Sequence, residues 1–247
     1  GIPTVTDRMI QQAAAQVLTP IYERKFHTNS YGFRPGKSAQ QAVLKAAEYM
    51  NEGYNWVVDI DLEKFFDTVE HDKMISILNK EIKDGKTLSL IRKFLASGVM
   101  VGEQMEETEI GTPQGGNISP LLANILLNEL DWELESRGLR FVRYADDCII
   151  LVRSEKAATR VMKSVTKYIE NVLRLKVNKD KSRIGRPTEI QYLGFAFYYQ
   201  FQEKKYRMKV PKKSLDKVKK KVRKLTSRKW SVSNSYKAKK IAENLIQ

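Results

Sequence analysis

The sequence is poor in cysteine and histidine: its 247 residues include one cysteine, Cys148, and two histidines. A single cysteine excludes an internal disulfide framework and any cysteine-rich zinc site. No apolar run approaches the roughly 20 residues that cross a membrane as a helix. The first four residues do not resemble a secretory signal peptide. We therefore expect neither a disulfide-stapled domain nor a membrane partner.

Acidic residues are scarce at one end of the chain. The whole sequence has 44 Lys and Arg against 29 Asp and Glu, which gives a net charge of +15. Residues 203–247 hold 17 of the basic residues and only 3 of the acidic ones. The excess charge is therefore concentrated in this arm, and the rest of the chain is nearly neutral. Such a distribution favours a polyanionic partner such as nucleic acid.

The arm is expected to contain an amphipathic basic helix. Apolar residues recur at helical spacing at Leu215, Val218, Val222 and Leu225. The other faces carry the candidate nucleic-acid-binding residues Lys212, Lys213, Lys219, Lys220, Lys221 and Arg223. A merely solvated face is one alternative, and a membrane- or calmodulin-binding helix is another, although the apolar stripe is narrow and aliphatic. We favour contact with phosphates.

The remaining pattern indicates a mixed α+β fold with enough apolar residues, 42%, for a substantial core. Periodicity and capping residues predict helices over 6–26, 38–50, 71–83, 87–97, 119–136 and 154–173, with Ser38, Ser119 and Ser154 as caps. Strands are expected over 55–62, 139–143 and 148–153, with a hairpin over 99–110 and short strands within 175–209. The strands are too scattered for a regular βαβ array.

Two acidic residues interrupt the apolar strand at 55–62. Asp59 and Asp61 share one face of it, because side chains alternate along a strand. Acids in such a strand are costly unless they are exposed at an edge, paired, or bound to a cation.

A second acidic pair, Asp146–Asp147, follows Tyr144 at a turn between two apolar strands. An ordinary Asp-bearing turn is the competing interpretation, although such turns usually contain Gly or Asn.

Residues 111–120 form a glycine-rich loop that leads into a helix. Such a loop lets backbone N–H groups approach a phosphate or a base. It lacks the lysine of a Walker motif, and a tight connection is the simpler alternative.

These three features indicate one chemistry if the two acidic strands are neighbours. Asp61 would then meet the Asp146–Asp147 pair. A cluster of carboxylates without His or Cys favours hard cations such as Mg²⁺. Two such ions can clamp an in-line phosphoryl transfer. Together with the basic arm, the pattern favours nucleotidyl transfer on nucleic acid.

The order and the amino-acid sequences of these segments resemble the motifs of reverse transcriptases, in the form found in group II intron-encoded proteins, or maturases. Residues 1–8 and 31–38 resemble the finger motifs, Asp61 with 65–67 motif A, 111–120 motif B, 144–147 motif C, 175–182 motif D and 192–195 motif E. The resemblance covers roughly residues 1–200. Seven motifs in order are far more specific than any one of them.

The resemblance implies a right-hand polymerase. Residues 1–54 would belong to the fingers, 55–202 to the palm with interleaved finger elements, and 203–247 to a basic arm that begins the thumb. The family's fingers begin earlier and its thumb is longer, so we expect a piece of a longer protein.

The resemblance also implies a metal site. Asp61, Asp146 and Asp147 would be catalytic and hold two Mg²⁺, with Mn²⁺ as a substitute, and the backbone carbonyl of Leu62 would add a ligand. Asp59 competes for the motif A position, which we assign to Asp61 because of its place before the Phe-Phe-Asp run.

Other residues receive roles by the same resemblance. Phe66, Gln114, Gly115, Arg34 and Lys181 would bind the nucleotide, and Tyr192, Leu193 and Gly194 would form the primer grip. Phe66 would be the wall that excludes a 2′-hydroxyl, so the substrates would be deoxynucleotides. One of the two phenylalanines is expected to be plain core. A solvated turn lysine is the alternative for Lys181.

The implied activity is RNA-dependent DNA synthesis from dNTPs on an RNA template and a DNA primer, with intron RNA as a further partner. One alternative is a non-catalytic intron-RNA-binding splicing cofactor. Another is a different bacterial reverse transcriptase lineage, such as a retron-like enzyme. An RNA-synthesising polymerase fits least, because Phe66 would obstruct ribonucleotides. The expected location is the bacterial cytoplasm, or an organelle in a eukaryote.

Overall fold

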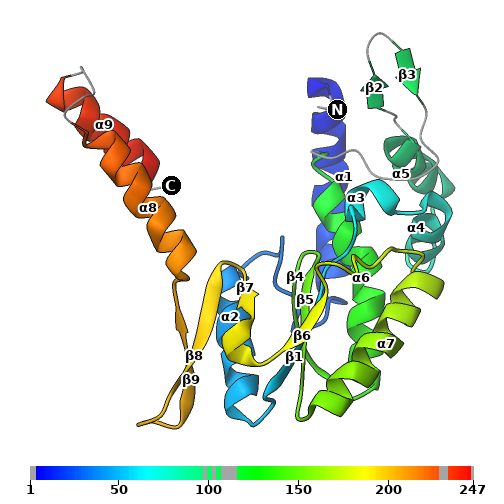
Figure 1. Cartoon of the computed structure of the whole chain (residues 1–247). Helices are drawn as coiled ribbons and strands as arrows, with labels where there is room; N and C mark the ends of the chain where they lie inside the picture. Colours follow the sequence, from blue (N-terminus) through cyan, green and yellow to red (C-terminus); the bar gives the residue numbers. More distant parts are fainter. Residues whose placement is uncertain (1–3, 97–98, 102–103, 107–115, 228–232, 246–247) are drawn as a thin grey trace.

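The computed structural model describes residues 4–96, 99–101, 104–106, 116–227 and 233–245 of the chain (Figure 1). Its helices are α1 (Val5–Glu23), α2 (Ala39–Asn51), α3 (Phe65–Thr68), α4 (His71–Leu78), α5 (Gly85–Ala96), α6 (Ser119–Ser136), α7 (Glu155–Asn171), α8 (Lys212–Leu225) and α9 (Asn234–Leu245). Its strands are β1 (Trp56–Ile60), β2 (Val99–Val101), β3 (Gln104–Glu106), β4 (Arg140–Tyr144), β5 (Asp147–Val152), β6 (Arg183–Gly185), β7 (Gln191–Tyr192), β8 (Phe195–Gln200) and β9 (Lys205–Lys209). The predicted α+β class is confirmed.

The central sheet has the strand order β4-β5-β1-β6, and each neighbouring pair is antiparallel. The strand β5 follows β4 through a two-residue turn, whereas β1 comes from much earlier in the chain and lies between β5 and β6. Ile60 of β1 is opposite Cys148 of β5. The sheet therefore places two acid-bearing segments, distant in sequence, side by side.

Alternate residues of this sheet enter two separate hydrophobic cores. Val58 and Ile150 belong to the core that also includes α1, α4, α5, α6 and α7. Val57 and Ile149 belong to a second core with α2 and the three-stranded sheet β7-β8-β9. Both faces of the sheet are therefore covered along much of its length, which explains why its strands are so apolar.

Two of the three predicted helix caps are confirmed. Ser38 accepts a hydrogen bond from the Gln41 N–H in a capping box, and Ser154 accepts one from the Ala157 N–H. The third prediction is wrong by one residue. Ser119 is the first residue of α6 rather than its cap, because Ile118 is buried and its carbonyl already accepts the N–H groups of residues 121 and 122.

The basic arm leaves the body through β9 and continues as α8 and α9, which project on the side of the sheet away from α1 (Figure 1). No side chain of α8 is buried. A pair of hydrogen bonds joins β9 to α2: the Tyr206 N–H donates to Asn51 Oδ1 at 2.7 Å, and Asn51 Nδ2 donates to the Tyr206 carbonyl at 3.3 Å. Among the described residues, none of the helices has the length and apolar character of a membrane span.

Candidate active site

Asp61 and Asp147 meet at one end of the central sheet. The register that sets Ile60 opposite Cys148 brings the residue after β1 next to the first residue of β5. Side chains alternate, so Asp59, Asp61 and Asp147 share the face of the sheet that enters the α2 core. The neighbouring strands required for the predicted cluster are therefore present.

The turn between β4 and β5 carries Asp146. Tyr144 and Asp147 form the last residue pair of the hairpin, which leaves Ala145 and Asp146 as its two-residue loop. Ala145 has a φ of 56°, as two-residue hairpin turns require at their first position. The turn therefore places Asp146 in the loop and Asp147 at the start of β5.

The loop at 29–34 closes tightly on this turn. The Tyr31 N–H donates to the Arg143 carbonyl at 2.8 Å, and the Arg143 N–H donates to the Asn29 carbonyl at 2.9 Å. A Cβ at Gly32 would lie 2.2 Å from the backbone nitrogen of Ala145. Only glycine fits there, a constraint that sequence reasoning missed. The finger-motif loop is thus part of the support of the acidic turn.

The acidic residues influence one another electrostatically. Desolvation, followed by repulsion from Asp146, Asp59 and Asp61, raises the pKa of Asp147 to about 6. The residue Asp147 as a whole is exposed, although its carboxylate is partly desolvated. The neighbouring carboxylates therefore add to the effect of burial on its pKa. A site of this kind favours the binding of a cation, which would offset the repulsion.

The two β1 acids have cationic neighbours from the segment at 181–183. Arg183 Nε lies 3.4 Å from Asp59 Oδ2, and Lys181 Nζ lies 3.8 Å from Asp61 Oδ1. Burial raises the pKa of Asp59, and Arg183 opposes the shift. Ser182 Oγ accepts a hydrogen bond from the Asp61 N–H at 3.0 Å. This segment therefore fixes the backbone of Asp61 and supplies positive charge beside it.

The donor set fits a hard cation, although the side chains are not arranged around one. Within the described ranges, no three Asp, Glu, His or Cys side chains form a ready-made metal cluster. The acids at the sheet end offer carboxylate oxygens only, the ligand type that Mg²⁺ prefers. Cys148 is buried in the core on the other face of the sheet, and burial raises the pKa of its thiol.

Phe65 and Phe66 follow the acidic strand and differ in environment. Phe65 is 3% exposed and belongs to the main core, whereas Phe66 is only partly buried. Their rings meet edge to face with centroids 5.2 Å apart. Leu62, just before them, forms a bridge with Val177. One of the two phenylalanines, Phe65, is therefore plain core, as expected, whereas Phe66 packs against the same core with part of its side chain exposed.

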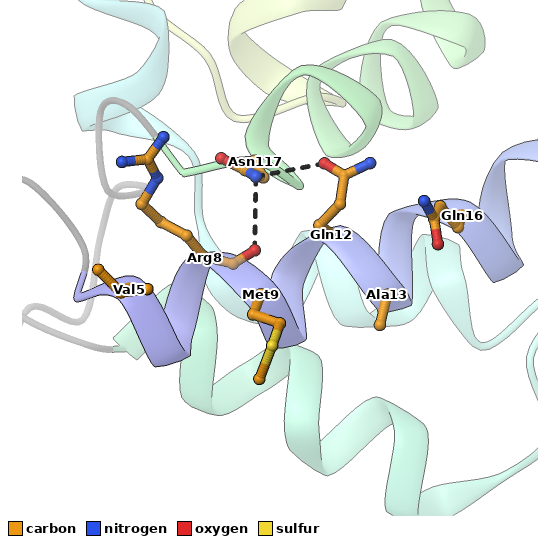
Figure 2. Close-up of a pocket in the computed structure, with 7 residues that line it drawn as sticks. All are labelled: Val5, Arg8, Met9, Gln12, Ala13, Gln16 and Asn117. Carbon is orange, nitrogen blue, oxygen red and sulfur yellow. Dashed lines mark hydrogen bonds between the residues drawn. The ribbon is translucent and has the colours of Figure 1, made fainter.

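Gln114 and Gly115 lie outside the described residues. The structure resumes at Gly116, and Asn117 ties this end of the glycine-rich segment to α1: its Nδ2 donates to the Arg8 carbonyl at 3.4 Å and to Gln12 Oε1 at 3.2 Å. Figure 2 shows these contacts in an open pocket of about 600 Å³ lined by α1 residues and Asn117. Asn117, shortly before α6, is therefore anchored on α1.

Arg34 is placed differently from the prediction. Its guanidinium bonds Glu23 at 2.6 Å and the carbonyls of His27 and Ser30 at 2.7 Å each, and its side chain is 6% exposed. This geometry argues against contact with template or nucleotide, because protein acceptors already enclose the group. Arg34 instead closes the loop that supports the acidic turn.

The expected primer-grip residues form the tight β7–β8 turn. Leu193 and Gly194 have φ values of 48° and 79°, as expected at a two-residue turn of type I′. The Tyr192 hydroxyl donates to the Val142 carbonyl at 3.2 Å, and the residue is 3% exposed. Tyr192 therefore attaches the hairpin to β4, one strand from the acidic residues.

The basic residues predicted to bind nucleic acid all lie on α8, away from the acidic cluster in sequence and on a separate element (Figure 1). They are Lys212, Lys213, Lys219, Lys220, Lys221 and Arg223, and each of them is exposed. The structure therefore presents the arm's charge to solvent.

An antiparallel sheet with carboxylates at the end of two central strands, helices packed on both faces and a hairpin sheet beside it defines the palm of a right-hand polymerase. Comparison with known proteins agrees. Residues 1–197 match the family model described as "Reverse transcriptase (RNA-dependent DNA polymerase)". The telomerase of Candida albicans shares the fold with a TM-score of 0.58, at 14% identity, over 84% of this chain and 38% of that one.

The chain belongs to the reverse transcriptase family, and its relatives include group II intron-encoded proteins. Group II intron-encoded protein LtrA of Lactococcus lactis is 43% identical over 149 residues, which are 60% of this chain and 25% of LtrA. Protein YkfC of Escherichia coli is 31% identical over 235 residues, 80% of this chain and 61% of YkfC. The chain thus spans less than two thirds of these relatives. The resemblance inferred from the motifs is confirmed.

Proposed function

We propose that this chain is the fingers-and-palm part of an RNA-directed DNA polymerase that extends a DNA primer with dNTPs on an RNA template. The family supports the class of reaction. The observation that carries the site is the β1–β5 register, which joins Asp61 to the Asp146–Asp147 turn. In this division, residues 1–54 are fingers, 55–202 palm with interleaved finger elements, and 203–247 a basic arm.

Asp61, Asp146 and Asp147 would hold two Mg²⁺, for which Mn²⁺ can substitute, and the Leu62 carbonyl would add a ligand. When bound, the ions would activate the attacking primer hydroxyl and stabilise the leaving pyrophosphate. Asp61 suits this role better than Asp59, because Arg183 on β6 hydrogen-bonds the Asp59 carboxylate at 3.4 Å. The cation beside Asp61, Lys181, lies 3.8 Å away, beyond hydrogen-bonding distance. Asp59 would then orient its surroundings rather than bind an ion.

The chain's own residues would bind and orient the nucleotide. Phe66 would form the wall beside the sugar, since it is the phenylalanine that is not fully buried. Gln114 and Gly115 would line the same pocket. Lys181, whose side chain is 69% exposed and lies beside Asp61, would bind the triphosphate or give a proton to the departing pyrophosphate.

The primer and RNA would be held by the remaining elements. The turn at Tyr192, Leu193 and Gly194 would support the primer, because it is attached to the strand that leads into the acidic turn. The basic residues of α8 would bind phosphates of the template–primer or of intron RNA. The second candidate function, intron-RNA binding to assist splicing without chemistry, rests on this same arm.

Primer extension by an Asp146→Asn variant tests the proposal. The change keeps the size of the side chain but removes its charge, so we expect extension to fall by at least about a thousandfold, while RNA affinity stays within about twofold. Glu155→Gln, on the exposed first turn of α7, is the control and should extend normally. Normal extension by Asp146→Asn would refute the metal-site assignment. A wild-type protein that assists splicing but does not extend the primer would support the second function alone.

A further inference from the structure

Arg143, the residue before the acidic turn's tyrosine, is fully buried beside a buried acid. Both Arg143 on β4 and Asp131 on α6 have side chains with 0% exposure, and Arg143 Nη2 lies 2.6 Å from Asp131 Oδ2. A second bond joins Arg143 Nε to Asp131 Oδ1 at 2.8 Å. The pair is therefore bidentate and shielded from water, the geometry in which an arginine fork is most specific.

Every N–H group of this guanidinium has an acceptor. Besides the two bonds to Asp131, Nη1 donates to Asn124 Oδ1 at 2.9 Å and to the Ala145 carbonyl at 2.8 Å. Nη2 also donates to Ser30 Oγ at 2.8 Å. The five donors of arginine are thus used by four residues. A lysine, with three donors on one nitrogen, cannot reproduce this planar set.

The acceptors come from three parts of the chain that surround the acidic turn. Ala145 lies in the turn itself, directly before Asp146. Asn124 and Asp131 lie on α6, the helix that the glycine-rich segment leads into. Ser30 lies in the loop that closes on the turn, and Asn124 Nδ2 also donates to the Gly32 carbonyl at 2.8 Å. Arg143 therefore fastens the turn to the fingers loop and to α6 at one point.

We propose that Arg143 is a positioning residue that fixes the backbone of the Asp146–Asp147 turn for catalysis. Buried ion pairs often add little stability over apolar packing of the same volume, so stability alone does not account for a buried arginine here. The bond from Arg143 to the Ala145 carbonyl gives the arginine a role, because the left-handed backbone conformation of Ala145 determines the direction of the chain at Asp146. The proposal rests on the proposed polymerase function, since it concerns the same acidic residues.

The test is Arg143→Lys, measured for single-nucleotide incorporation and for amide hydrogen exchange across residues 141–149. We expect the turnover number to fall about ten- to a hundredfold, the effect of a misplacement of about 1 Å. KM for the dNTP should change by less than about threefold, and exchange at the turn should become faster. A residue that only stabilises the fold would not alter the turnover number selectively at a temperature well below the unfolding midpoint.

Val165→Ala is the matched control, because Val165 is 1% exposed on α7 and packs in the main core rather than in the network of Arg143. It should lower the unfolding temperature while leaving turnover and exchange at the turn unchanged. Ser30→Ala removes one acceptor and serves if Arg143→Lys does not fold. It should lower turnover by a few fold and also speed exchange at the turn.

The outcomes separate the two proposals. The positioning role would be overturned if Arg143→Lys or Ser30→Ala matched Val165→Ala both in turnover number and in the rate of amide hydrogen exchange at the turn. A wild-type protein without primer extension would overturn the proposed function instead, and faster exchange at the turn of the variant would still support the positioning of the turn by Arg143.

Discussion

Gly32 is required by its neighbour rather than by its own backbone angles. The space that a side chain would need is taken by backbone atoms of the Ala145 turn, and backbone atoms cannot move aside as a flexible side chain would. A single glycine in the fingers loop therefore determines how closely that loop approaches the acidic residues.

Gly32→Ala should push the loop and the turn apart. We expect a loss of about 1–3 kcal/mol in the free energy of unfolding, as for other overpacked sites, and a fall in primer extension of at least about tenfold. Thermal unfolding and single-nucleotide incorporation measure the two effects.

Gly85→Ala is the control for this change. Gly85 begins α5 and nothing lies within 4 Å of its Cβ position, so alanine should be neutral or slightly stabilising there. Equal losses in the two variants would show that the close contact of Gly32 with Ala145 is unimportant.

Phe66→Ala should relax the discrimination against ribonucleotides, because the side chain that we propose as the wall beside the sugar would be removed. The measurement is the ratio of kcat/KM for a dNTP to that for the matching ribonucleotide. Phe65→Leu is the paired control: Phe65 is core, so this change should lower stability by about 1 kcal/mol and leave the ratio as it is. An unaltered ratio in Phe66→Ala would remove Phe66 from the sugar wall.

Residues whose role depends on sequence-local patterns are predictable, and residues whose role depends on distant partners are not. The alternation of Asp59 and Asp61 with apolar residues indicates an acidic face. The motif resemblance assigns Arg34 to the nucleotide. A motif does not reveal the acceptors that enclose Arg34, which lie on α1 and in the loop that follows it. Arg143 gives a usable signal, a charge within an apolar strand, which points to a partner but not to Asp131.

The helix α8 concentrates positive charge without contributing a buried side chain. Its stripe of Leu215 and Val218 is 45% and 50% exposed. A helix with this much exposed charge is stabilised poorly by packing, and its positive charge suits a polyanionic partner.

Replacing Lys219, Lys220, Lys221 and Arg223 by Gln should weaken RNA binding and flatten its dependence on salt. The slope of log K against log[salt] should become shallower by about 0.7–0.9 for every phosphate that the arm no longer neutralises. Filter binding between about 50 and 200 mM salt measures the slope.

The control for α8 is an equal reduction of charge on α7, at Lys156, Arg160, Lys163 and Lys167. Since that helix is not part of the arm, its variant should keep most of the wild-type slope. The same flattening in both variants would mean that net charge, rather than α8, determines RNA affinity.

The elements with clear periodicity or caps, α8 of the arm included, are predicted well, whereas α3 and α9 are not. The helices α2 and α7 begin where Ser38 and Ser154 indicate. The helix α3 has four residues and follows Lys64, whose φ is 44°, so it has neither the length nor the cap that would signal it. The helix α9 is absent from the sequence-based prediction, because its sequence is polar and no strong apolar stripe marks it.

The arrangement of the strands is a property of the whole molecule. The order β4-β5-β1-β6 inserts an early strand between two late ones, and both faces of the resulting sheet pack against elements distant in the sequence. From the sequence alone, the shared metal site could be inferred only by assuming that the two acidic strands are neighbours. The pairing of β1 with β5 supplies the geometry that this inference lacks.

Asn51→Ala should loosen the attachment of the arm to the body, because the side chain of Asn51 makes both hydrogen bonds to Tyr206. Each such bond is worth about 0.5–1.5 kcal/mol, and less where water competes. We expect faster hydrogen exchange in β9 and an unfolding midpoint lowered by a few °C. Gln40→Ala, exposed on the same helix, should change neither. Unchanged exchange in β9 would show that other contacts hold the arm.

The burial of Cys148 has a practical consequence. It is the chain's one cysteine, it is 3% exposed, and its thiol is held in the protonated, unreactive form. A cysteine introduced on α8 would therefore be the one thiol that a maleimide dye modifies in the native protein. Fluorescence could then follow the arm as it meets RNA, without first replacing the natural cysteine beside the acidic turn.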